Sequence, residues 1–587
     1  MMNVDNIHKN LIRLLTIIVI LTAFPTGSVF CQQSSPEKVG KSAGQHLEAF
    51  AVFTDRNLYI VGEDILFTVY NQSDKALKDI SWSTVVYLEL ISSEKESLIQ
   101  EKFRLRQEGI NGYIEIPQSI LSGTYYLRVY TRWMKNLPPE KYAYSRIKIV
   151  NPYNSEVSQA SVESQVEQYK SMASLAAPMD DMGIAINSDK QTYEQRSKVQ
   201  LSISTRGFES DNLTGLCLTV IREAAFDTSG YYEYHSDGSD VSNKDGAIYV
   251  PETRGMAVTG EVIDKLEQRP MPNTRVQLSV IGEDPDYFGY LTGQDGKFYI
   301  TIPDYTGLKD FYISAETGTS SGFEILIDKD FSTEFLDFRA WPFHLSDKER
   351  LLAEEMMVNV QVQNAYMGDV HSIDSTSDYF DKPNFYGNPL LTVETDEFVK
   401  LPSLEEFFYE VIPTVTVNRT GGQKELVVFG DYSDLAIYKP LILLDHVAIS
   451  DLSSILSVSP EKIDHIDVIN ASYIRGSINY GGIISIFSKK HDLAGVDLPG
   501  YSYFFGLKTL AVQELISFPS YVKDKGDLRE PDFRNCLIWL PNLTLDEQGS
   551  SEAQFYTSDK KGEYHIYLRG ITSDGRVVSG QSTIYVE

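Results

Sequence analysis

The sequence predicts a mainly β protein, built from several β-sandwiches in tandem with one α+β module among them. Residues 46–151 contain about seven short runs of alternating apolar and polar residues, separated by turn residues at regular spacing, which is typical of a sandwich. Residues 440–490 change to a different pattern, a strand at 441–444, a short helix at 452–458, a strand at 463–469 and a closing strand at 483–487, bounded by Pro, Asp and Gly. A chain of 587 residues has room for roughly three to six domains.

The expected order along the chain has nine parts. They are a signal peptide (1–31), a sandwich (46–151), a linker (152–181), a second sandwich (182–254), a third sandwich (255–330), a helical connector (331–387), the α+β module (388–490), a second linker (491–530) and a C-terminal β region (531–587).

The N-terminus predicts export. Lys9 and Arg13 precede an apolar run that ends at Pro25 and is too short to cross a bilayer, so we expect a cleaved signal peptide and no membrane span. A lipid anchor at Cys31 is the less favoured alternative, because the large Phe30 stands where a lipid-anchored cysteine needs a small neighbour. The expected location is the periplasm, or the outer membrane through partner proteins.

The formal charge of −30, from 82 acidic and 52 basic residues, argues against a nucleic-acid partner, because phosphate would be repelled. The acidity is consistent with simple solubility, and a calcium-bridged or basic partner is the alternative. Asp237, Asp240 and Asp245 lie close in sequence, but their spacing does not fit an EF-hand loop, so a solvated loop is favoured there.

The first sandwich contains Asp55-Arg56-Asn57-Leu58-Tyr59, then Gly62-Glu63, and later Gly123 to Arg128. This pattern resembles the second macroglobulin (MG2) domain of alpha-2-macroglobulins. A similar turn with Lys190 and Tyr193 opens the second sandwich, which indicates an internal repeat.

The second sandwich offers only about three strand patterns before its loop, and the C-terminal region about four. A sandwich needs nearer seven. We therefore expect residues 184–222 and 535–585 to touch, as one sandwich or side by side. Trp539-x-Pro541 and Phe555-Tyr556 resemble a macroglobulin-type sandwich of bacterial alpha-2-macroglobulins. Cys217 and Cys536 stand in apolar strand patterns, and either two buried thiols or a disulfide fits.

The third sandwich has a predicted hairpin at Asp295-Gly296. With Thr292, Gly296 and Phe298 it resembles the carboxypeptidase regulatory-like domain, an accessory fold that implies no peptidase chemistry. Two capping boxes, Ser346 with Glu349 and Ser403 with Glu406, predict helix starts in the connector and in the α+β module.

The α+β module has Leu443-Leu444-Asp445, then residues 463–468, then Tyr480-Gly481-Gly482 before a closing strand. This order resembles the plug domain of TonB-dependent outer-membrane receptors, although His446 stands where that family has Gly. A receptor barrel needs about 22 strands, and 97 residues follow Lys490 in this chain of 587. The resemblance therefore implies a recognition or scaffold module without a barrel.

The sequence contains no HExxH, CxxC or Cys-Gly-Glu-Gln thioester motif. We expect no catalytic activity, no cofactor and no metal. The predicted function is an envelope scaffold that docks onto an outer-membrane protein assembly; the alternative is a glycan- or peptide-binding protein of nutrient uptake that uses Tyr231, Tyr232 and Tyr234.

The candidate protein-contact loop lies within residues 470–482 and contains Tyr473, Arg475, Tyr480, Gly481 and Gly482. Tyr and Arg are enriched where interfaces take their energy, and glycine lets a partner approach closely. The alternative, given equal weight, is that Gly481-Gly482 merely form the turn into the last strand.

Overall fold

The structure is a computed structural model. It describes residues 48–587 except 74–81, 107–108, 159–183, 206–212, 227–232, 235–247, 283, 317–321, 338–342, 368–383, 421–422, 431–436, 513–515, 522–530 and 574. Leu47–Val241 and Tyr249–Glu587 form one compact unit; of the other unit, Met1–His46 with Ser242–Ile248, only Ile248 is described. The expected signal peptide, Cys31, residues 159–181 of the expected linker and the Asp237, Asp240 and Asp245 group thus lie outside the described residues.

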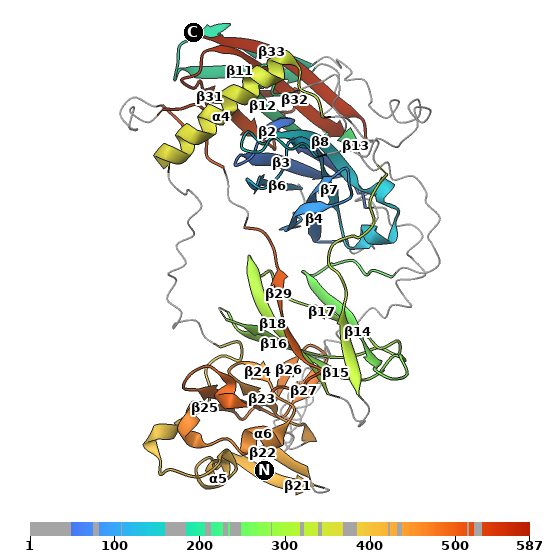
Figure 1. Ribbon diagram of the computed structural model, residues 1–587, viewed down its shortest axis with the longest axis vertical. Coiled ribbons are helices and arrows are strands. Elements are labelled where there is room, and N and C mark those ends of the chain that lie inside the picture. Colours follow the sequence, from blue (N-terminus) through green and yellow to red (C-terminus); the bar gives the residue numbers. More distant parts are fainter. Residues whose placement is uncertain are drawn as a thin grey trace, which may run out of the picture. The chain divides into compact units, whose positions relative to one another are not determined.

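The first sandwich has one sheet of three strands and one of six (Figure 1). The smaller has the order β1 (Phe50–Thr54), β3 (Asp64–Asn71), β6 (Ile110–Glu115). The larger has the order β13 (Glu233–Tyr234), β8 (Ala143–Val150), β7 (Gly123–Tyr130), β4 (Val85–Ser92), β5 (Ser97–Arg104), with β2 (Leu58–Ile60) pairing parallel to β8. Every residue of β4 and β7 is buried. Both faces of this sheet are therefore covered at its centre.

The face of β4 and β7 that points away from the smaller sheet is covered by the chain segments just before and just after the third sandwich. Arg128 on β7 forms a fully buried ion pair with Glu89 at 2.6 Å and donates to the carbonyl oxygens of Ser332 and Glu334. Glu252 accepts from the Tyr87 hydroxyl on β4. Buried charges persist when they are paired and hydrogen-bonded.

The second sandwich is built from two distant parts of the chain. One sheet has the order β10 (Thr192–Tyr193), β33 (Val577–Val586), β32 (Gly562–Thr572), β12 (Leu213–Arg222), β30 (Cys536–Leu540), and the other β31 (Ser550–Tyr556), β11 (Lys198–Thr205), β9 (Ile184–Ser188). β12 pairs with both β30 and β32, and β11 with β31. The expected contact between residues 184–222 and 535–585 is therefore observed, as a single sandwich (Figure 1).

The repeat at the start of the two sandwiches extends to individual atoms. The Tyr59 hydroxyl donates to the Asp55 carboxylate at 2.7 Å, and the Tyr193 hydroxyl donates to Asp189 at 2.8 Å. In each copy the aspartate also accepts a backbone N–H eleven residues ahead, from Leu66 or Gln200. Each tyrosine lies on a short strand that pairs parallel, to β8 or to β33.

The third sandwich has a sheet of three strands and one of four. They are β17 (Lys297–Thr301), β14 (Ala257–Asp264), β19 (Phe323–Ile327), and β16 (Asp286–Leu291), β15 (Arg275–Ile281), β18 (Leu308–Glu316), β29 (Tyr503–Lys508). β29 corrects an expectation, because it lies in residues 491–530, where the sequence predicts a linker. It pairs with β18 over six residues, and Phe505 stacks on Phe311 at 5.6 Å.

The connector contains α4 (Asp347–Met367), whose N-terminus has the expected capping box: Ser346 N–H donates to Glu349, and Glu349 N–H donates to Ser346 Oγ. The α+β module has a five-stranded sheet in the order β20 (Leu391–Glu394), β25 (Ile463–Ile469), β28 (Ile483–Ser488), β23 (Leu441–Leu444), β24 (Val447–Ala448). Its other elements are α5 (Leu404–Glu410), α6 (Leu452–Leu456) and two hairpins, β21 (Val415–Thr420) with β22 (Gln423–Val428), and β26 (Tyr473–Arg475) with β27 (Ile478–Tyr480).

Candidate interaction site

The predicted contact loop is the β26–β27 hairpin with the turn that follows it, and the structure gives it partners inside the chain. Arg475 lies against β16 of the third sandwich: it donates from Nε to the Tyr287 carbonyl oxygen at 3.0 Å and forms an ion pair with both carboxylate oxygens of Asp286. Its guanidinium also lies 4.8 Å from the centre of the Phe288 ring. We call the contacts of residues 473–480 with residues 286–291 the latch.

Tyr480 supplies the buried aromatic contact of the latch. It is 1% exposed, and its hydroxyl lies 2.5 Å from that of Tyr287, which is fully buried. Burial raises the pKa of Tyr480 to about 12, so the pair stays uncharged near neutral pH. Both rings belong to an apolar cluster with Leu441, Leu443 and Ile483 of the module's sheet. The two modules therefore share a small core.

Backbone contacts add to the latch. Ser477 N–H donates to the Gly289 carbonyl oxygen at 3.0 Å, and Leu291 N–H donates to Ser477 Oγ at 3.1 Å. Gly476 has φ +67°, and a Cβ there would collide with the carbonyl oxygen of Gly289. Glycine is thus required at this point for two reasons, the backbone conformation and the close approach.

The hydrogen bonds of Tyr473, Gly481 and Gly482 are made to residues within the α+β module or just before it. The Tyr473 hydroxyl donates weakly to the Phe385 carbonyl oxygen at 3.4 Å. Gly481 N–H donates to Lys439, Leu441 N–H donates to Gly482, and Gly482 has φ +103°. These glycines form the entry to β28, as the alternative interpretation has it. Within the hairpin, Arg475 and Tyr480 contact the third sandwich, whereas the side chain of Ile474 is 70% exposed.

Exposed apolar side chains gather in the α+β module, and sequence reasoning did not single them out. Eight of the 23 large exposed hydrophobic residues among the described residues lie in 388–490, which holds about a fifth of the described residues: Leu390, Phe398, Val399, Tyr409, Phe429, Ile437, Tyr438 and Ile474. Exposed apolar side chains that lie next to one another mark interaction surfaces, whereas single ones are ordinary. The sequence of α5, LEEFFYE, could have indicated an exposed apolar side chain. It contains more apolar and aromatic residues than the three that are buried, Leu404, Phe407 and Phe408.

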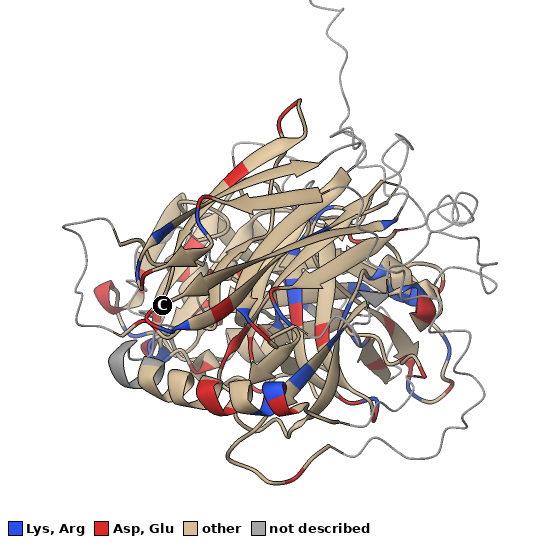
Figure 2. Cartoon of the chain, turned by 90° about the horizontal axis from the view of Figure 1, so that it is seen from above, with Lys and Arg blue, Asp and Glu red and all other residues tan. Residues whose placement is uncertain are grey.

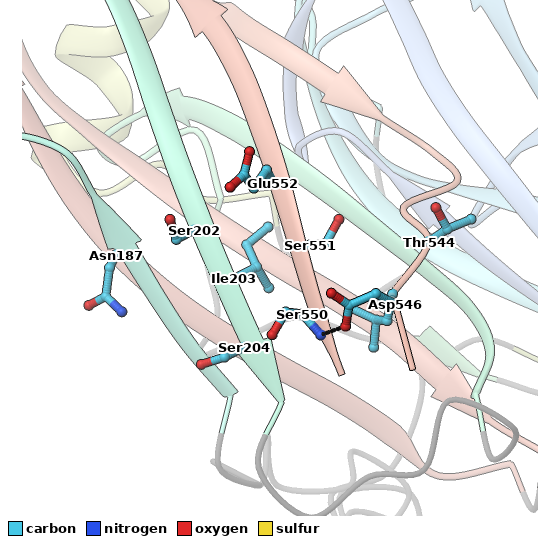
Figure 3. A pocket seen from close by; sticks show the side chains of 10 residues that line it. Asn187, Ser202, Ile203, Ser204, Thr544, Asp546, Ser550, Ser551 and Glu552 are labelled. Carbon is cyan, nitrogen blue, oxygen red and sulfur yellow. Dashed lines mark hydrogen bonds between the residues drawn. The ribbon is translucent and has the colours of Figure 1, made fainter. Parts of the chain in front are cut away.

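An open hollow of about 550 Å³ lies on the second sandwich (Figure 3). It is lined mainly by hydroxyl and carboxylate groups, among them Ser202, Ser204, Asp546 and Glu552, and its lining contains no aromatic ring on which a sugar could stack. Of the tyrosines expected to bind glycans, Tyr231 and Tyr232 lie outside the described residues, and for Tyr234 only the backbone pairing with Tyr144 is described. The glycan alternative stays a prediction.

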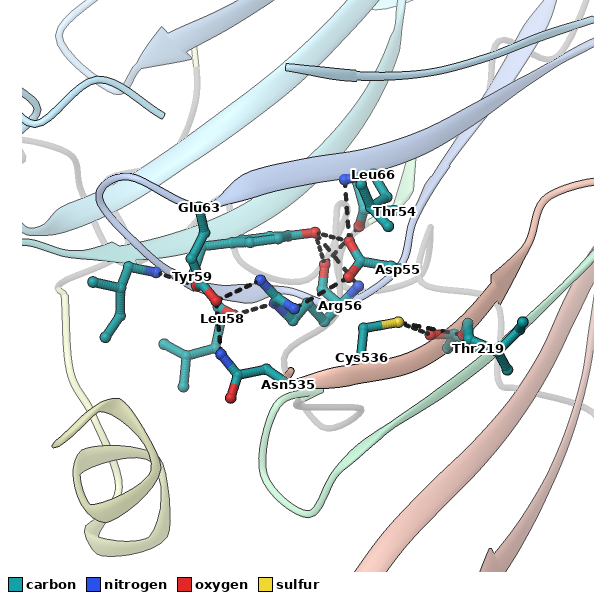
Figure 4. A network of polar contacts seen from close by, with 12 residues as sticks. Thr54, Asp55, Arg56, Leu58, Tyr59, Glu63, Leu66, Thr219, Asn535 and Cys536 are labelled. Atoms are coloured by element: carbon teal, nitrogen blue, oxygen red, sulfur yellow. Dashed lines mark hydrogen bonds and ion pairs between the residues drawn. The ribbon is translucent and has the colours of Figure 1, made fainter. Parts of the chain in front are cut away.

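A buried polar network joins the first two sandwiches (Figure 4). Arg56 contacts Glu63 at 2.9 Å and Asp55 at 3.4 Å, and Asn535 donates to Glu63 at 2.7 Å. Asn359 of α4 donates to the same Asn535. Because Arg56, Asp55 and Asn535 are each less than a tenth exposed, this network acts as a structural joint.

Cys217 and Cys536 are both buried and do not form a disulfide. Burial raises the pKa of Cys536 to about 12, which leaves it a thiol at neutral pH and chemically inert. The disulfide alternative is therefore wrong, and the buried-thiol interpretation is confirmed.

Charged positions of both signs are interspersed over the strands and along α4 (Figure 2). Within the described part of the chain, no helix combines the length and the apolar character needed to cross a bilayer.

No family model matches the sequence, and no curated protein is similar to it. Solved structures are similar at low levels. Salmonella alpha-2-macroglobulin reacted with methylamine is 10% identical, with a TM-score of 0.23, covering 92% of this chain and 39% of that one. The native conformation of Escherichia coli alpha-2-macroglobulin is 10% identical, with a TM-score of 0.22, covering 93% and 40%. Dimeric latent PorU from Porphyromonas gingivalis is 8% identical, with a TM-score of 0.15, covering 49% and 34%.

The chain spans about two fifths of the length of the macroglobulin structures that it matches. Similarity at this level assigns no role to any residue. Two of the solved structures that resemble this mainly β chain at such low levels are alpha-2-macroglobulins.

Proposed function

We propose that the chain is a non-catalytic scaffold of the bacterial cell envelope, whose α+β module docks onto an outer-membrane protein assembly. The signal peptide expected from the sequence and the resemblance of residues 388–490 to receptor plug domains suggest the location. In this proposal the macroglobulin-like sandwiches and the carboxypeptidase regulatory-like sandwich hold and present the module. The observation that supports it best is that one module combines an internal attachment with a concentration of exposed apolar side chains.

The internal attachment is the latch. It fixes the module to the third sandwich through an ion pair, a tyrosine pair and backbone hydrogen bonds. The segments that enter and leave the third sandwich in turn contact the first sandwich: Glu252 accepts from Tyr87, and Arg128 donates to the Ser332 and Glu334 carbonyl oxygens. A module held by such contacts loses little conformational entropy when a partner binds, which favours affinity.

The docking surface that we propose is centred on Val399 and Tyr409, which are 83% and 76% exposed. They lie on neighbouring elements, joined by the edge-on contact of Phe398 with Phe407 at 5.9 Å. Large apolar side chains that stay in water in the unbound protein gain free energy when a partner covers them, at about 25 cal/mol per Å². The latch residues Arg475 and Tyr480 support the surface from inside instead of forming it.

The test is affinity purification from cross-linked envelopes. The double variant Val399→Glu/Tyr409→Glu should lose the outer-membrane proteins that the wild type recovers. Leu266→Glu is the matched control, because Leu266 is 87% exposed on the third sandwich and should leave recovery unchanged. If the folded double variant recovers the same proteins in the same amounts, the proposed surface is wrong. Recovery of periplasmic proteins alone would contradict the proposed outer-membrane partner.

A further inference from the structure

Three metal-ligating side chains meet on the α+β module, away from the latch. The pairing of β20 with β25 places Glu394 opposite His465. The register of β25 with β28 shifts between Ile463 and His465, which marks a β-bulge. Adjacent residues of a regular strand point to opposite faces. Here the irregularity brings Asp464 to the side of His465, and one ligating atom from each of Glu394, Asp464 and His465 lies within 4.8 Å of the others.

The imidazole of His465 is already oriented. Its ring stacks on Phe487, with centroids 4.3 Å apart and planes at 15°. Its Nδ1 lies 2.9 Å from Asp464 Oδ2. The stacking on Phe487 already restricts the imidazole, so His465 loses less rotational freedom when it binds a metal than a free surface histidine would. A shared ion would take the place of the direct contact between Nδ1 and Asp464. The orientation is fixed by contacts independent of Glu394.

We propose that Glu394, Asp464 and His465 bind a divalent transition-metal cation, with Zn²⁺ as the best fit. Zn²⁺ takes imidazole nitrogen at about 2.0 to 2.1 Å and carboxylate oxygen at about 2.0 to 2.2 Å, commonly with three protein ligands and water in the fourth position. The nitrogen ligand favours a transition metal over Ca²⁺ or Mg²⁺, which prefer oxygen. Glu394 and Asp464 are exposed and His465 is half-buried, so the two carboxylates have room to rotate toward a shared ion.

The surrounding charges favour a cation. Two lysines of the module have carboxylate partners of their own: Lys400 pairs with Glu461 and Lys489 with Asp396, both at 2.6 Å. Lys462 donates to the Ala494 carbonyl oxygen at 2.9 Å. The net charge of −30 also raises the cation concentration around the chain. A bound ion would tie the four-residue edge strand β20 to β25. It would therefore stabilise the module in proportion to the metal concentration, whether or not the module docks onto an outer-membrane protein.

The test is isothermal titration of the untagged chain with Zn²⁺ after EDTA treatment. We expect saturable binding of one Zn²⁺, with affinity reduced at least tenfold by His465→Ala and severalfold by Glu394→Gln or Asp464→Asn. His565→Ala is the matched control, because His565 also has one carboxylate partner, Glu563 at 3.0 Å, but belongs to no group of three ligands among the described residues.

Peptide-resolved hydrogen exchange supplies a readout that does not depend on the heat of binding. Zn²⁺ should slow exchange in residues 391–394 and 463–469 of the wild type and not of His465→Ala. Equal Zn²⁺ affinity in His465→Ala, or Ca²⁺ affinity equal to that for Zn²⁺, would overturn the proposal. So would the absence of saturable Zn²⁺ binding by the folded wild type.

Discussion

Arg475 and Asp286 form an ion pair across 189 residues of sequence and thereby join the α+β module to the third sandwich. The two side chains are 30% and 10% exposed, so water screens the pair only in part. Both oxygens of Asp286 accept from the guanidinium, and Tyr305 donates to the same carboxylate at 2.9 Å. An ion pair in which both carboxylate oxygens accept charge-assisted hydrogen bonds contributes measurably to stability.

Arg475→Ala should weaken the latch by roughly 1 to 3 kcal/mol, because it removes charge-assisted hydrogen bonds and leaves a largely buried carboxylate without its cation. Hydrogen exchange in residues 473–480 should accelerate while exchange in β25 and β28 stays slow. Arg419→Ala is the control within the same module: Arg419 is 72% exposed and pairs with Glu405 at 3.4 Å, so its loss should change little. Equal exchange in both variants would contradict the latch.

Gly476→Ala should open the latch without changing any charge. The added methyl group would meet the Gly289 carbonyl oxygen, in addition to the strain of placing alanine at φ +67°. Gly307→Ala separates the two effects, because Gly307 has φ +77° and no atom lies within 4 Å of the place that its Cβ would take. We expect Gly307→Ala to cost about 1 kcal/mol from strain alone, and Gly476→Ala to cost clearly more. Similar shifts in thermal midpoint for the two variants would show that the close approach is not required.

The local elements of the fold could be predicted well from sequence. The strands Leu441–Leu444 and Ile463–Ile469 have the bounds expected of them, because β-branched runs there are closed off by Pro, Asp and loop residues. The helix expected at 452–458 ends earlier, at Leu456. β29 was missed because its sequence YFFGLK shows no alternation: it is an edge strand whose residues are mostly exposed.

The candidate site could be predicted only in part, since periodicity indicates which face of a strand is buried but not by what. Tyr480 is followed by two glycines, a pattern that fits an exposed loop or a packed turn equally well. What decides is Tyr287, 193 residues earlier in the chain, against which Tyr480 is buried. Val399 was overlooked for the converse reason, because an isolated valine beside Phe398 resembles core. Contacts between modules depend on domain placement, which a single sequence does not encode locally.

Glu252 should make stability depend on pH. It is fully buried between Tyr87 and the Ala257 N–H, and burial, opposed in part by Arg132, raises its pKa to about 7. Because the folded pKa lies above the unfolded one of about 4.5, the stabilising contribution is complete below pH 4.5 and is lost as the pH rises through 7. A shift of this size corresponds to at most about 3 kcal/mol.

Glu252→Gln keeps the shape of the protonated form and does not titrate. The variant should therefore gain stability relative to the wild type between pH 5 and pH 8, which calorimetric thermal midpoints at both pH values would show. Glu324→Gln, at an exposed position on β19, is the control and should track the wild type at both pH values. If the thermal midpoints of Glu252→Gln and the wild type change by the same amount between the two pH values, the pKa of Glu252 is not raised by folding.

The repeated Asp-x-x-x-Tyr turn allows one hydrogen bond to be compared in two environments of the same chain. Asp55 is fully buried, whereas Asp189 is exposed. Tyr59→Phe deprives a buried carboxylate of a donor that water cannot replace, and it should cost roughly 1.5 to 3 kcal/mol. Tyr193→Phe leaves a carboxylate that water can solvate, so it should cost about 0.5 kcal/mol. The backbone N–H groups of Leu66 on β3 and Gln200 on β11 donate to the two aspartates. Hydrogen exchange of these two strands therefore measures each loss of stability locally. If Tyr193→Phe proves as costly as Tyr59→Phe, burial is not what distinguishes the two copies.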